Sequence, residues 1–140
     1  MNMRPWLAAA GLLAVLCAPG ASACGYCVED KIASAYDHAV ISRALNRQHH
    51  VVFFHIEGVL APGEDTRRAL EAIAESTAGV DKGSARASVE AATLSFAFDP
   101  QRAPLATVHR ALERRLAARK LALMPLRVME RPAELSTVRR

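Results

Sequence analysis

The sequence predicts an α+β fold, a ferredoxin-like βαββαβ sandwich with an extra N-terminal helix that covers the open face of the sheet. Residues 50–57, His-Val-Val-Phe-Phe-His-Ile-Glu, form a β-branched and aromatic run closed by Gly58. Both pleat faces of this run are apolar, which is typical of a strand that is covered on both sides. Downstream, helical and strand-like periodicities follow in the order α-β-β-α-β. Upstream lies one more helical pattern.

The first 23 residues are expected to be an export signal. Arg4 gives a positive start, residues 6–17 are apolar, and Ala21-Ser-Ala23 fits a small-x-small cleavage site. We therefore expect a periplasmic or secreted protein that begins at Cys24, with a lipoprotein acylated at Cys24 as the alternative. No later stretch approaches the roughly 20 apolar residues of a membrane-spanning helix, so none is expected in the mature chain.

Residues 24–47 are expected to carry a Cys-x-x-Cys motif followed by one helix over residues 28–46. Acidic Glu29 and Asp30 occupy the first turn and Arg43 a late turn, as the helix dipole favours. Apolar side chains recur at helical spacing at Val28, Ile32, Ala35, Ala39 and Val40.

The ferredoxin-like domain is expected over residues 48–130, with a polar, mobile tail at 131–140. Its elements after the central strand are predicted as helix, strand, strand, helix and strand at residues 65–77, 85–90, 93–98, 105–116 and 121–129. One face of the sheet should hold the core side chains Val52, Phe54, Ile56, Leu94, Phe96 and Phe98.

The other sheet face is also apolar, because Val51 and Phe53 lie there. Their expected neighbours Thr93, Ser95 and Ala97 are small and allow a helix to approach closely. The N-terminal helix is the expected cover, which gives three layers.

The charge pattern argues against a nucleic-acid partner. The signal carries one of the 18 basic residues, so 17 remain against 14 acidic ones, a net charge of +3 in the mature chain. These basic residues are interspersed with acids, as in Glu113-Arg-Arg115, and no aromatic residues alternate with them.

Residues 50–129 resemble the heavy-metal-associated domain of copper chaperones and metal-pumping ATPases. The similarity is carried by Phe54-His-Ile-Glu-Gly58, by Gly79-Val80 and by the segment from Ser88 to Asp99-Pro100. That family has a Cys-x-x-Cys in the loop after the strand glycine, and its two positions fall here on Ala61 and Glu64. The resemblance therefore implies the fold and brings no metal site in this loop.

A different Cys-x-x-Cys, Cys24-Gly-Tyr-Cys27, is expected to reach the same end of the sheet. A 19-residue helix is about 28 Å long, and an eight-residue strand is about 26 Å. Running antiparallel, the helix returns Cys27 to the strand end that holds His55. Cys24, Cys27 and His55 are thus the candidate ligands for a soft ion, Cu(I) or Zn(II). We expect a metal-handling protein that passes its ion to a protein partner.

Three alternatives remain open. Cys24 and Cys27 can instead form a disulfide, which closes only a four-residue loop and stabilises little. Cys-Gly-Tyr-Cys before a helix also resembles the dithiol of glutaredoxins, so a periplasmic thiol–disulfide oxidoreductase is the one enzymatic alternative. The third alternative is a metal-free ferredoxin-like interaction module in which His55 is a hydrogen-bonded core residue.

Overall fold

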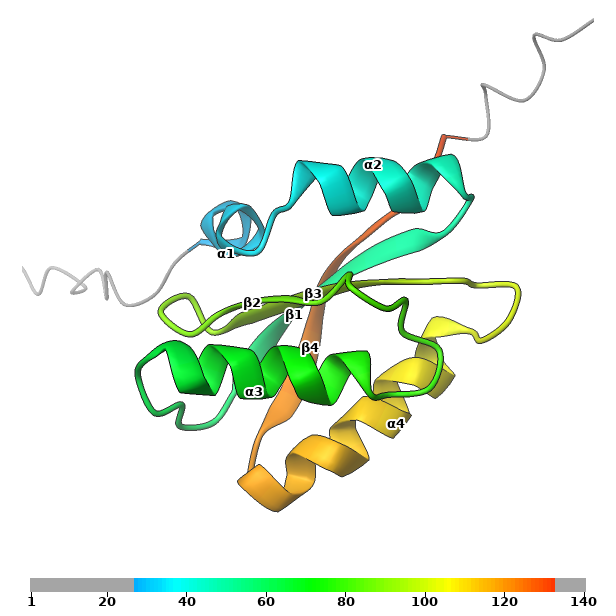
Figure 1. Cartoon of the computed structure of the whole chain (residues 1–140). Coiled ribbons are helices and arrows are strands. Elements are labelled where there is room, and N and C mark those ends of the chain that lie inside the picture. The colour runs from blue at the N-terminus through cyan, green and yellow to red at the C-terminus, as the bar shows by residue number, and fades with distance from the viewer. Residues whose placement is uncertain (1–26, 133–140) are drawn as a thin grey trace, which may run out of the picture.

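The computed structural model describes residues 27–132 and places their helices and strands in three layers (Figure 1). The predicted signal peptide, Cys24 and residues 133–140 of the predicted tail lie outside the described residues. The strands are β1 (His50–Glu57), β2 (Arg86–Ser88), β3 (Thr93–Phe98) and β4 (Ala122–Met129). The helices are α1 (Val28–Ser34), α2 (His38–Asn46), α3 (Glu64–Glu75) and α4 (Leu105–Leu116), with a short 3₁₀ turn, η1 (Ala117–Arg119), after α4.

The four strands form one antiparallel sheet in the order β2-β3-β1-β4, as a βαββαβ sandwich requires. β1 is central: it pairs with β3 along one side and with β4 along the other. Figure 1 shows α3 and α4 on one face of the sheet and α1 and α2 on the other. The predicted fold class is confirmed, including the third layer.

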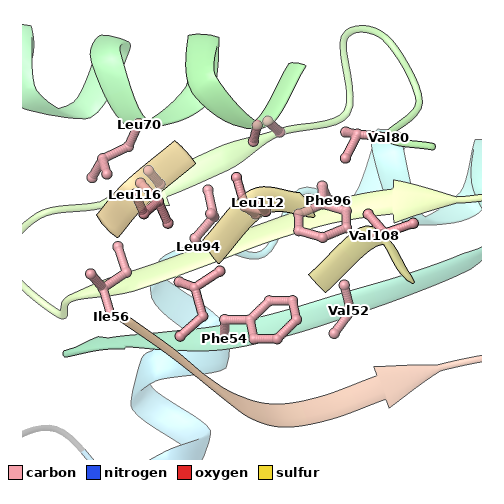
Figure 2. Packing of buried hydrophobic residues seen from close by; sticks show 14 of the residues in the cluster. Val52, Phe54, Ile56, Leu70, Val80, Leu94, Phe96, Val108, Leu112 and Leu116 are labelled. Carbon is pink, nitrogen blue, oxygen red and sulfur yellow. The ribbon is translucent and has the colours of Figure 1, made fainter. Parts of the chain in front are cut away.

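The main core lies between the sheet and the pair α3 and α4 (Figure 2). All six side chains predicted for this face belong to it and are almost fully buried. They pack against buried side chains from the two helices, Leu70, Val108, Leu112 and Leu116. Gly58 follows β1 and packs closely against the residues that follow η1. A Cβ atom at this position would lie only 2.7 Å from the carbonyl oxygen of Lys120, which is too close for a side chain.

A second, smaller core lies between the sheet and the N-terminal helices. Val51, Phe53 and Ala97 from the sheet pack against Ile32, Ala35, Ile41 and Ala44. The small side chains of β3 allow the N-terminal segment to approach the sheet closely, as predicted. The Ser95 hydroxyl donates a 2.8 Å hydrogen bond to the carbonyl oxygen of Ala35. Burial of Phe53 therefore depends on the N-terminal layer.

The prediction of one continuous helix over residues 28–46 is wrong. The chain leaves the helical path between α1 and α2, where the Asp37 carboxylate accepts a hydrogen bond from the Val40 N–H at 3.1 Å and caps α2. The same carboxylate pairs with Arg86 at 2.8 Å, and the freed Ala35 carbonyl is satisfied by Ser95. These contacts replace the helical hydrogen bonds that the break removes.

The predicted strand at residues 85–90 is shorter in the structure. β2 ends at Ser88, and a turn follows in which the Ala92 N–H donates to the Val89 carbonyl at 3.2 Å. Within residues 27–132, no helix has the length and apolar character needed to cross a membrane.

We expect Phe53→Asp to destabilise the protein by more than about 3 kcal/mol, because it removes a buried ring and buries an unpaired charge. Phe53 is 0% exposed. Val59→Asp is the matched control, since Val59 is 93% exposed and should change stability by less than about 0.5 kcal/mol. Chemical denaturation measures both. Equal stability of the two variants would contradict the three-layer packing.

The cap at Asp37 should give stability a specific pH dependence. The Val40 N–H, and after it the Arg86 guanidinium, hold the pKa of Asp37 below its ordinary value of 3.8. A carboxylate with a lowered folded-state pKa stabilises the fold above its unfolded pKa, and this contribution is lost as pH falls through the folded pKa.

Asp37→Ala should therefore cost about 1–2 kcal/mol at pH 7, and this difference from the wild type should shrink below about pH 4. Asp37→Asn keeps the capping oxygen without the charge, so it isolates the ionic part. Denaturant unfolding from pH 3 to 7 tests this. A difference between the wild type and Asp37→Ala that is constant across this range would refute the ionic contribution.

Candidate functional site

His55 lies near the end of β1, on the sheet face that the N-terminal helices cover. In the sheet it stands between Thr93 of β3 and Met124 of β4. Its side chain is half-buried. The predicted placement of His55 beneath the N-terminal segment is therefore found, although α1 rather than a continuous helix reaches it.

The Nδ1 atom of His55 has two polar neighbours. It lies 3.0 Å from the carbonyl oxygen of Ala92 and 3.2 Å from the Nζ of Lys31. A neutral ring satisfies one of them at a time: an Nδ1–H donates to Ala92, whereas an Nδ1 lone pair accepts from Lys31. In the first tautomer the lone pair is on Nε2, and none of the hydrogen bonds found in residues 27–132 involves that atom. A histidine that binds a metal through Nε2 has this arrangement, with its other nitrogen held by a carbonyl.

Lys31 carries the contact between α1 and His55. Its ammonium group donates a 2.7 Å hydrogen bond to the carbonyl oxygen of Ala91, in the turn between β2 and β3. Two residues earlier, Glu29 pairs with Arg127 of β4 through two hydrogen bonds, of 3.1 and 2.5 Å. These bonds also hold the pKa of Glu29 below its ordinary value, so the pair is ionised at neutral pH. Both sides of α1 are thus tied to the sheet.

Cys27 stands directly before α1 as its N-cap residue and is exposed. Its thiol donates to the Asp30 carboxylate at 3.1 Å, and its carbonyl accepts the Lys31 N–H at 3.0 Å. The part of the chain that the structure describes shows no hydrogen bond between Cys27 and His55. Lys31, one helical turn beyond Cys27, occupies the position next to the imidazole instead.

The predicted ligand set is only partly described. Cys24 lies outside residues 27–132, so its position relative to Cys27 and His55 is not among the described features. Among the described residues, no group of three or more histidine, cysteine, aspartate or glutamate side chains could hold a metal ion.

His49 is a polar residue whose contacts the sequence did not indicate. It precedes β1, and its Nδ1 lies 2.6 Å from an Asp81 carboxylate oxygen while its Nε2 lies 3.8 Å from Asp99. Both ring nitrogens face carboxylates from distant parts of the chain. These contacts hold the α2–β1 connection against the sheet, at the end opposite to His55.

A hollow of about 840 Å³ lies between the C-terminal end of α3 and one side of α4. Its carboxylates are engaged within the fold: Glu75 accepts the N–H groups of Gly83 and Ala85, and Asp81 binds His49. Asp99 accepts the N–H of Gln101. The hollow contains none of the predicted site residues.

Comparison of the chain with protein-family models, with curated proteins and with solved structures finds no match.

Proposed function

We propose that the protein is an exported metal-handling protein. It binds one soft ion, Cu(I) or Zn(II), through Cys24 and Cys27 with help from His55, and passes the ion to a partner protein. The observation that carries this proposal is the contact of Lys31 with His55, because Lys31 lies on the short helix that begins directly after Cys27.

The distances along the chain are compatible with one shared site. Residues four apart on a helix have Cβ atoms about 5–6 Å apart, so Cys27 starts one turn from the lysine that contacts His55. Cys24 precedes Cys27 by three residues, and a chain segment of this length spans at most about 10 Å. Rotation of the Cys27 side chain away from Asp30 would let a thiolate-bound metal approach the Nε2 atom of His55, while Lys31 stays hydrogen-bonded to the Ala91 carbonyl beside Nδ1.

The charges near His55 favour a thiolate complex. Two thiols that bind Cu(I) release two protons, and the resulting bis-thiolate complex carries one negative charge. The Lys31 ammonium, 3.2 Å from the His55 ring, supplies one positive charge beside it. A nearby opposite charge of this kind stabilises the anionic complex.

The exposure of Cys27 suits metal transfer. Cys27 is exposed at the edge of the described fold, whereas structural zinc sites are closed by four protein ligands. An exposed pair of thiolates can be attacked by the thiolates of a partner, so the ion moves by ligand exchange. The family that residues 50–129 resemble handles metal at the same end of its first strand, beside the residue that corresponds to Gly58.

A dithiol–disulfide function is the second candidate, and the position of Cys27 favours it. An exposed cysteine at a helix N-terminus is the arrangement of reactive dithiols. However, dithiol exchange needs only the two cysteines and gives no role to His55, whereas the contact of Lys31 with His55 brings an imidazole ligand close to the start of α1. Metal binding is therefore preferred.

The proposal is tested by titrating reduced, exported protein with Cu(I) against a competing chelator. Intact mass first establishes that the chain begins at Cys24 with an unmodified amine. We expect one ion per chain. Cys24→Ser and Cys27→Ser should each weaken binding by more than about 100-fold, since loss of a direct ligand should exceed the 10–100-fold cost of losing an outer one. His55→Gln should weaken it about tenfold.

His38→Gln is the matched control, because His38 is exposed on α2 and its one side-chain hydrogen bond within residues 27–132 is to Ser42 of its own helix. It should leave the affinity unchanged. Absence of stoichiometric binding by the wild type would end the metal proposal. If such a protein equilibrates rapidly with a glutathione redox buffer, the dithiol function takes its place.

A further inference from the structure

Met124 of β4 lies directly opposite His55 of β1 in the antiparallel sheet. Side chains opposite each other in such a pair lie on the same face, with Cβ atoms about 4.5–5.5 Å apart. His55 is on the face of the N-terminal helices, since it contacts Lys31. Met124 is therefore on that face too, beside the imidazole.

The environment of Met124 differs from that of Leu126 and Met129, which lie further along β4. Leu126 and Met129 pack against the second core, whereas Met124 is 47% exposed. An exposed methionine contributes little to packing, and its thioether is accessible to a ligand. Its position opposite His55 distinguishes Met124 from Leu126 and Met129.

α1 approaches β4 as well as β1 on this face. The bond between Glu29 and Arg127 joins the first turn of α1 to β4, and Glu29 is only two residues after Cys27. The segment that carries Cys27, the strand that carries His55 and the strand that carries Met124 thus meet at one corner of the sheet.

We infer that Met124 is a further ligand of the proposed site, and that its thioether makes the site selective for Cu(I) over Zn(II). Thioether sulfur is a soft, neutral donor that suits Cu(I). Zinc sites in proteins instead use thiolate, imidazole and carboxylate. Two thiolates, one imidazole and one thioether form a four-donor set in which Met124 adds no charge. This inference rests on the proposed metal-binding function.

The chain offers its own control for the test. Of its four methionines, Met1 and Met3 lie in the predicted signal, so the exported protein keeps only Met124 and Met129. Met129 is on the same strand and the same face, opposite Val51, and packs against the second core. Methyl-¹³C-methionine labelling therefore gives two resonances, one for the proposed ligand and one for a matched reference.

On titration of exported, reduced protein with Cu(I), the Met124 methyl resonance should shift with one equivalent of metal and the Met129 resonance should stay in place. Met124→Leu, which keeps the apolar volume and removes the sulfur, should weaken Cu(I) binding about tenfold. Met129→Leu should leave it unchanged, and Zn(II) affinity should be the same in both variants. Circular dichroism confirms that the variants are folded.

The outcomes separate this inference from the function on which it rests. If the wild type binds Cu(I) stoichiometrically but Met124→Leu binds equally well and the Met124 methyl does not shift, the thioether ligand is refuted and the metal function stands. If the wild type binds no Cu(I), the proposed function itself fails.

Discussion

The fold depends on one constraint: β1 is apolar on both faces and lies in the middle of the sheet. A two-layer ferredoxin-like sandwich would cover only the face that holds Phe54 and expose the face that holds Phe53. Leaving the latter face in water would forfeit about 2–3 kcal/mol for Phe53 alone. The N-terminal helices are therefore held against the sheet, as the burial of Phe53 and its packing against Ile41 and Ala44 show.

The candidate site is a consequence of the same constraint. Because side chains alternate along a strand, His55 faces the same layer as Phe53, but at the rim of the second core. There it is tolerated because Nδ1 has a hydrogen-bond partner in either tautomer, the Ala92 carbonyl or the Lys31 ammonium. The layer that buries Phe53 also brings the start of α1 to this rim, and the pairs Lys31–His55 and Glu29–Arg127 fix its position.

Much of the fold could be predicted from the sequence, since β1, β3 and α4 have the bounds that periodicity gives. Apolar spacing does not predict the break before α2, because the spacing continues through it, although Asp37, three residues before Val40, is a recognisable capping signal. Other features depend on tertiary register. Met124 is opposite His55 only because β4 has an irregularity beside Phe53 and Phe54, and His49 meets carboxylates 32 and 50 residues away. Sequence spacing carries no signal for such pairings.

The proposed metal site requires that packing of the N-terminal layer brings the cysteine thiolates and the His55 imidazole to one ion. X-ray absorption at the copper edge of the Cu(I)-loaded, exported protein tests it most directly, because it identifies the bound atoms without relying on affinity. We expect sulfur scatterers together with the outer-shell scattering of one imidazole ring, and loss of the ring signal in His55→Gln. A spectrum of sulfur alone in the wild type would show that the Cys-x-x-Cys segment binds copper without the sheet and would refute the shared site.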